Sequence, residues 1–95
     1  MVTQAIYKLQ YLHPSALENL INKIMAEREK LSVRAKNCSP RLTDIKEILP
    51  LLYPEPTFNR KRVQHCGKKA EQEILQFLRM AKLIFEEYTN DIDIS

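Results

Sequence analysis

The chain has 95 residues, an apolar fraction of 44%, a charged fraction of 28% and a formal net charge of +3. This length allows one domain with a modest core. The chain contains a single glycine, which argues against hairpin-rich folds and against a glycine-rich phosphate loop. No apolar stretch approaches the roughly 20 residues of a membrane span, and residues 1–10 lack the apolar block of a signal peptide. We therefore expect a cytoplasmic protein.

Four stretches of helical periodicity are predicted. The first spans residues 2–12 and ends at His13, because the residue before a proline is disfavoured in the α conformation. The second begins at Ser15, which can form a capping box with Glu18, and continues to Lys36.

The third predicted helix begins with Ser39 as its N-cap and ends or kinks at Pro50. The fourth and longest runs from about Phe58 to Tyr88, with Gly67 inside it. Its apolar positions recur every three or four residues: Val63, Cys66, Ala70, Ile74, Phe77, Ala81, Ile84 and Tyr88. The pattern predicts an all-α fold, a small four-helix bundle with a long C-terminal helix. Residues 1–90 would form this single helical domain, and residues 91–95 an acidic tail.

The residues that could support catalysis or bind a metal form no recognisable set. No Ser, His and Asp stand at the spacings of a hydrolase triad, and most carboxylates are flanked by Lys or Arg. The histidines and cysteines do not have the spacing of a zinc site: His13, Cys38, His65 and Cys66. We expect reduced thiols, with Cys66 acting as a small buried residue. The sequence therefore predicts no enzymatic activity, no cofactor and no metal.

The distribution of charge is more informative than its total. Residues 1–85 contain 15 basic and 8 acidic residues, a net charge of +7, whereas residues 86–95 contain acidic charges only. At about 100° per residue, basic side chains form one row on the fourth predicted helix and a comparable row on the second. A solvated face of an ordinary helix would give the same pattern. The candidate contacts to nucleic acid are Lys23, Lys30, Arg34, Arg60, Lys61, Arg62, Lys68, Lys69 and Arg79.

Charges at the two ends of the fourth predicted helix oppose its dipole. The cluster at residues 60–62, which are Arg, Lys and Arg, falls in the first turn, and Glu86 and Glu87 fall in the last. Each such charge costs about 0.3–1 kcal/mol when exposed, and a broken local rule often marks a functional site. Free amides and three cations together could hold an anion. Phosphate is the favoured ligand, and an acidic patch on a partner protein is the alternative.

The fourth predicted helix also has a wide apolar surface. Leu75, Leu83 and Phe85 are candidate protein-interface residues, because they extend beyond a single buried face. A helix surrounded on all sides by its own bundle is the alternative. On the second predicted helix Arg28 falls within the apolar stripe, and we expect its guanidinium to reach water at the edge of that stripe.

The two basic rows and the cluster at residues 60–62 make the chain resemble the small helical subunit of CRISPR effector complexes. Those subunits are helical bundles of about this size. They hold target-strand or displaced-strand backbone through Lys and Arg inside a ribonucleoprotein of antiviral defence. The resemblance covers the whole chain. It implies a non-catalytic subunit that contacts single-stranded DNA or RNA, neighbouring subunits or copies of itself, and no membrane. The other hypothesis is a protein-interaction adaptor, or a viral or phage regulatory protein, without nucleic-acid contact.

Overall fold

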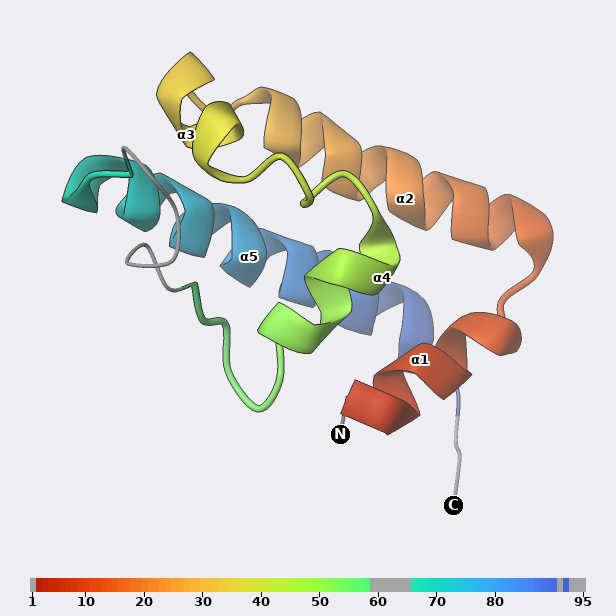
Figure 1. Ribbon diagram of the computed structural model, residues 1–95. Helices are drawn as coiled ribbons and strands as arrows, with labels where there is room; N and C mark the ends of the chain where they lie inside the picture. Colours follow the sequence, from red (N-terminus) through yellow and green to blue (C-terminus); the bar gives the residue numbers. More distant parts are fainter. Residues whose placement is uncertain (1, 59–65, 91, 93–95) are drawn as a thin grey trace.

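A computed structural model describes residues 2–58, 66–90 and 92 of the chain. Over these residues the fold is all-α, with a long C-terminal helix, as predicted from the sequence. Its elements are shown in Figure 1: α1 (Val2–Gln10), α2 (Pro14–Glu29), α3 (Val33–Cys38), α4 (Ile45–Ile48), the 3₁₀ helix η1 (Leu49–Leu51) and α5 (Lys68–Thr89).

The antiparallel pair of α2 and α5 forms the centre of the fold. The two helices lie side by side along most of their length (Figure 1), and α3 also packs on α5, near its start. Helices α4 and α1 complete the core, with α1 against η1. Burying a large apolar side chain contributes about 1.5–3 kcal/mol. The buried apolar residues of α5 are Ala70, Ile74, Phe77, Leu78, Ala81, Ile84 and Phe85.

The long helix begins ten residues later than the apolar spacing predicted. Gly67 is the N-cap of α5 rather than an interior residue, and Phe58 lies outside any helix. Glycine is tolerated at an N-cap position because its backbone adopts the extended conformation found there. Cys66 is buried as expected, but in the segment before the helix. The basic cluster at residues 60–62 lies outside the described residues, and the first turn of α5 begins at Lys68.

The second predicted helix is in fact two helices. Helix α2 ends at Glu29, and α3 begins after Ser32, whose Oγ accepts a hydrogen bond from the Ala35 amide at 3.2 Å. The predicted capping box at Ser15 is not formed. The N-cap of α2 is His13, whose Nδ1 accepts from the Ser15 amide at 3.2 Å. Proline at the following position has the φ that a first helical residue needs.

The third predicted helix is shorter than expected. Ser39 is the C-cap of α3 rather than an N-cap, and its Oγ donates to the Ala35 carbonyl at 2.8 Å. Helix α4 begins after Asp44, whose Oδ1 accepts from the Lys46 amide at 2.9 Å. Pro50 lies inside η1, where the chain tightens from α to 3₁₀ geometry, consistent with the predicted helix end or kink.

Arg28 does not reach the solvent as predicted. It is 91% buried, because its exposed fraction is 9%. Its Nη2 donates to the Ser39 carbonyl oxygen at 3.0 Å, and its Nε has no hydrogen-bond partner among the described residues. The guanidinium thus ties the last turn of α2 to the end of α3, at the cost of one buried unsatisfied N–H group.

Truncating the buried face of α5 should destabilise the protein strongly. Ile74 and Phe77 are 0% and 3% exposed, so Ile74→Ala and Phe77→Ala should each lower the free energy of unfolding by about 2–5 kcal/mol. The matched control is Arg79→Ala, an exposed position on the same helix, which should change it by less than about 0.5 kcal/mol. Urea unfolding monitored by circular dichroism measures both, and equal effects would contradict the assigned faces of α5.

Candidate nucleic-acid interface

A hydrogen-bonded junction holds the start of α3 beside the start of α5. The amide and the hydroxyl of Ser32 donate to the two carboxylate oxygens of Glu73, at 3.0 and 2.9 Å. The backbone and side-chain hydrogen bonds from Ser32 hold the pKa of Glu73 below its ordinary value, and the positive charge of Lys69 adds to this. Because Ser32 caps α3, Glu73 anchors that short helix to the second turn of α5.

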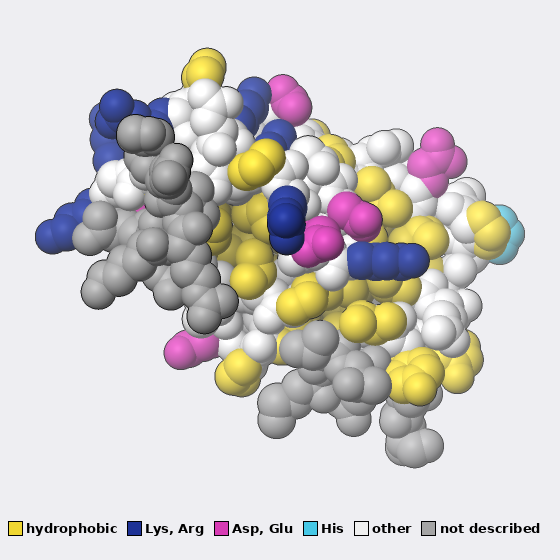
Figure 2. All heavy atoms as spheres, in the orientation of Figure 1, with side chains coloured by type: hydrophobic (Ala, Val, Ile, Leu, Met, Phe, Trp, Pro, Cys, Tyr) yellow, Lys and Arg dark blue, Asp and Glu magenta, His cyan; other side chains and the backbone are white. Residues whose placement is uncertain are grey.

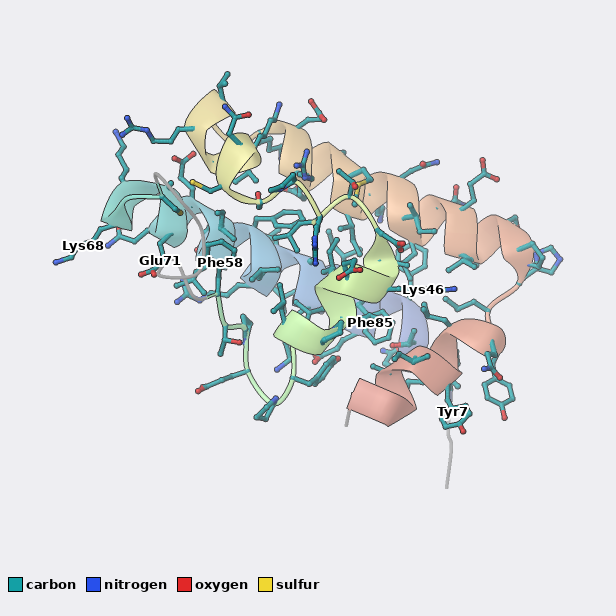
Figure 3. The ribbon with its side chains drawn as sticks, viewed as in Figure 1. Tyr7, Lys46, Phe58, Lys68, Glu71 and Phe85 are labelled. Atoms are coloured by element: carbon teal, nitrogen blue, oxygen red, sulfur yellow. The ribbon has the colours of Figure 1, made fainter. Side chains whose placement is uncertain are left out.

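The junction gathers cations from three helices at one end of the molecule. We call this set the basic end: Lys30 at the C-cap of α2, Arg34 and Lys36 on α3, and Lys68 and Lys69 in the first turn of α5. Figure 2 shows Lys and Arg side chains gathered where Figure 1 places α3 and the start of α5. Figure 3 shows Lys68 extending away from the body of the protein.

Three cations of the basic end, which we call unneutralised, form no ion pair with a described residue. Lys30 pairs with Glu27 at 3.1 Å, and Lys36 pairs with Glu29 at 3.0 Å. Arg34, Lys68 and Lys69 form no ion pair with any residue that the structure describes. The two lysines also lie at the positive end of the α5 dipole, where a cation is disfavoured and an anion is stabilised.

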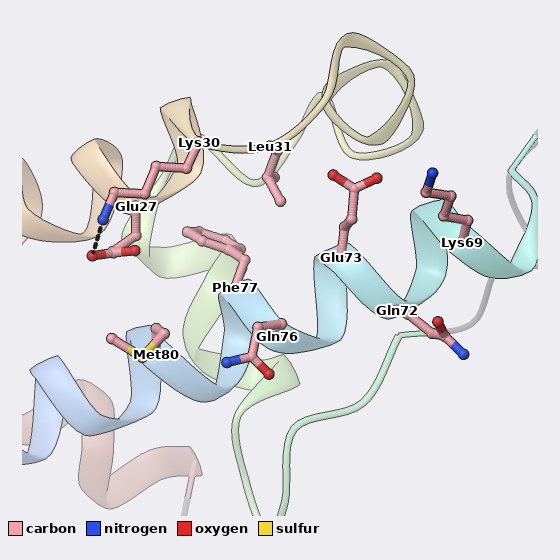
Figure 4. A pocket seen from close by; sticks show the side chains of 9 residues that line it. All are labelled: Glu27, Lys30, Leu31, Lys69, Gln72, Glu73, Gln76, Phe77 and Met80. Carbon is pink, nitrogen blue, oxygen red and sulfur yellow. Dashed lines mark hydrogen bonds and ion pairs between the residues drawn. The ribbon is translucent and has the colours of Figure 1, made fainter.

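A groove opens next to the basic end, between the C-terminal end of α2 and the first half of α5 (Figure 4). Its apolar lining comes from Leu31, Phe77 and Met80, and its polar lining is of two kinds. The amides are Gln72 and Gln76, and the charged side chains are Glu27, Lys30, Lys69 and Glu73.

The structure brings together only some of the predicted basic contacts. Lys23 lies near the middle of α2, and its Nζ is 5.3 Å from the centroid of the Tyr88 ring, near the C-terminal end of α5. The predicted row through Lys23, Lys30 and Arg34 is therefore broken, because α2 ends before Arg34. Arg79 is exposed on α5, eleven residues beyond Lys68. Arg60, Lys61 and Arg62 lie outside the described residues.

Of the predicted interface residues, only Leu83 is prominent on the surface, at 62% exposed. The prediction was wrong for Phe85, which is 1% exposed and packs edge-to-face on Tyr53 with ring centroids 6.4 Å apart; Figure 3 shows it between α4 and α5. Leu75 is half-buried and packs against the core. At Phe85, therefore, the alternative prediction is the correct one: this side of the helix is covered by its own bundle.

Sequence reasoning missed a different apolar surface, on α1. Ile6, Tyr7 and Tyr11 are 39%, 48% and 65% exposed. Figure 3 shows Tyr7 pointing away from the body of the protein. The two tyrosines stand four residues apart, with Tyr7 in α1 and Tyr11 in the turn that follows it. That spacing was the available signal, but the same stretch also supplies the buried Ala5.

Glu86 has a structural partner that accounts for its unfavourable position in the last turn of α5. Tyr53 Oη donates to Glu86 Oε1 at 3.3 Å, and Lys82 Nζ lies 4.0 Å from the same oxygen. Lys82 also donates to the Pro54 carbonyl at 3.3 Å. Burial, together with the negative charge and hydrogen bond of Glu86, raises the pKa of Tyr53 to about 12. These contacts fasten the segment after η1 onto α5.

No set of three or more His, Cys, Asp or Glu side chains within the described ranges is arranged to hold a metal ion. Cys38 and Cys66 are both buried. None of the helices in the described part of the chain combines the length and apolarity needed to cross a bilayer. Comparisons of the chain with protein-family models, with curated proteins and with solved structures give no match.

The Ser32–Glu73 junction should make stability depend on pH. A carboxylate whose pKa is lowered by folding stabilises the protein above its unfolded pKa, and this contribution disappears as pH falls through the folded pKa. Wild type should therefore be more stable than Glu73→Gln at neutral pH, with the difference shrinking below the ordinary value of 4.5. Urea unfolding of both proteins at several pH values measures this difference.

Glu87→Gln is the matched control, because Glu87 is exposed and makes no hydrogen bond to another described element. It should show no wild-type advantage at neutral pH. An advantage over Glu73→Gln that is equally large at low pH would contradict the role of the carboxylate charge.

Proposed function

We propose that this protein is a non-catalytic helical subunit that holds the backbone of single-stranded nucleic acid inside a larger assembly. The observation that carries the proposal is the set of three unneutralised cations at the basic end, Arg34, Lys68 and Lys69. They come from two helices that the Ser32–Glu73 junction holds together. A subunit role like that of the CRISPR small subunit is one setting in which such backbone binding is used.

Phosphate is the ligand that best suits these cations. Like charges gathered on one surface repel each other, and Lys68 and Lys69 also oppose the dipole of α5. A phosphate backbone removes both costs and releases its own counterions on binding. The cluster at residues 60–62 precedes α5 in the sequence. Its three positive charges would strengthen the binding of the same phosphate backbone.

Backbone binding of this kind should be insensitive to sequence. Cations that contact phosphates position the nucleic acid without reading its bases. The three cations are exposed at one end of the molecule, where a flexible strand can pass over them. The expected ligand is therefore single-stranded DNA or RNA of any sequence.

A second function, as a protein-interaction adaptor, is favoured by the apolar surface of α1. Ile6, Tyr7 and Tyr11 are exposed there, and tyrosines are enriched at protein interfaces. This surface lies on a different helix from the basic end. The two functions are therefore separable by mutation. In an assembly, neighbouring subunits could bind the surface of α1 while nucleic acid binds the basic end.

Removing the three cations should weaken binding without unfolding the protein. Arg34→Ala, Lys68→Ala and Lys69→Ala together should reduce the slope of log affinity against log salt by roughly 0.7 per lost phosphate contact, or about two in total. Fluorescence anisotropy with a labelled single strand at several salt concentrations measures the slope. Lys46→Ala, an exposed cation on α4, is the control and should leave the slope unchanged.

Two further outcomes separate the alternatives. A combined replacement of Arg60, Lys61 and Arg62 by Ala tests the sequence-based cluster independently of the basic end, and we expect it to reduce the slope as well. If the wild type binds no strand at low salt, either alone or within its native complex, the nucleic-acid function is wrong. The adaptor function would then be the one to pursue.

A further inference from the structure

The groove in Figure 4 lies directly beside the cations that are proposed to hold phosphate. Lys69 belongs both to the basic end and to the lining of the groove. The groove has a volume of about 650 Å³, within the range of clefts that accept small organic groups. A strand whose backbone crosses Lys68 and Lys69 would therefore have its bases within reach of this groove.

The four charged side chains that line the groove balance in sign, but one of the two lysines has no ion pair with a described residue. Glu27 and Lys30 form an ion pair, and Glu73 keeps its negative charge while it accepts two hydrogen bonds from Ser32. Lys69 makes no ion pair or hydrogen bond with a described residue, although its charge helps to lower the pKa of Glu73. An occupant with a negative charge at Lys69 and an uncharged body, which avoids repulsion by Glu27 and Glu73, would match this arrangement.

The uncharged part of the groove has both hydrogen-bonding and apolar groups. Gln72 and Gln76 are exposed, and their spacing of four residues places them on one side of α5. Each amide both donates and accepts, so together they can pair with the varied edges of unstacked bases. Leu31 and Met80 supply apolar surface next to them. Methionine is flexible and polarisable, which suits contact with flat rings of different shapes.

We propose that the groove between α2 and α5 takes an unstacked base of a bound single strand, while Lys69 holds the adjoining phosphate. The proposal rests on the proposed function and narrows its ligand to base-bearing single strands. A duplex is disfavoured, because its bases are stacked and paired and cannot enter without being extruded. An acidic peptide fits less well, because Glu27 and Glu73 also line the groove and would repel its carboxylates.

The test compares three labelled oligonucleotides of equal length on the full chain: a mixed-sequence single strand, an abasic single strand with the same phosphates, and a duplex. The wild type should bind the base-bearing strand roughly tenfold more tightly than the abasic strand, the loss expected when about two hydrogen bonds to a base are missing. Replacing both Gln72 and Gln76 by Ala should remove most of this preference. The salt slope should not change, because no charge is lost.

Gln10→Ala is the matched control, since Gln10 is an exposed glutamine at the end of α1, outside the groove. It should retain the full preference for bases. Met80→Ala tests the apolar lining of the groove and should also reduce the preference for the base-bearing strand. Circular dichroism spectra that overlay with wild type show that loss of the preference does not come from unfolding.

The outcomes separate the groove from the basic end. Equal binding of base-bearing and abasic strands by the wild type, with a normal salt slope, would overturn the base site and leave the proposed function intact. Tighter binding of the duplex than of the single strand would also overturn the base site. Binding of a glutamate-rich peptide but of no oligonucleotide would overturn both proposals and assign the groove to an acidic partner.

Discussion

The buried face of α5 packs along α2, and the positions of the other helices follow from this contact. Large apolar side chains from both helices fill the space between them, with Leu20, Ile24 and Ile74 at most 1% exposed. The pairing is antiparallel (Figure 1), so it sets the end of α2 beside the start of α5. That arrangement creates both the groove and the framework on which α3 is held.

Polar contacts then hold α3 in place on this framework. Glu73 holds the N-cap of α3, and Arg28 holds its C-terminal end through the Ser39 carbonyl. A six-residue helix is too short to be stable alone, so α3 depends on these two anchors and on its packing against α5. The position of Arg34 relative to Lys68 and Lys69 follows from the same contacts, which links the fold to the proposed phosphate surface.

The sequence predicted the helical class and the buried stripe of α5, because these depend on local periodicity and composition. It also predicted the burial of Cys66, but as part of a helix that in fact begins only at Lys68. It did not predict the start of α5. Val63 and Cys66 continue the apolar spacing in the sequence, but the helix begins only after its N-cap, Gly67. The Ser32–Glu73 junction joins residues 41 positions apart, which no local pattern reveals. The sequence identified the basic residues. Which of them form ion pairs and which do not depends on tertiary contacts.

The most direct test of the account is a map of where a single strand binds. In a titration of the isotope-labelled protein with a short oligonucleotide, followed by amide chemical shifts, the largest changes should fall in residues 32–36 and 68–80. Those ranges contain the unneutralised cations and most of the groove. Small changes should appear along α1. Changes confined to α1, around Ile6, Tyr7 and Tyr11, would contradict the assignment of the nucleic-acid surface to the basic end.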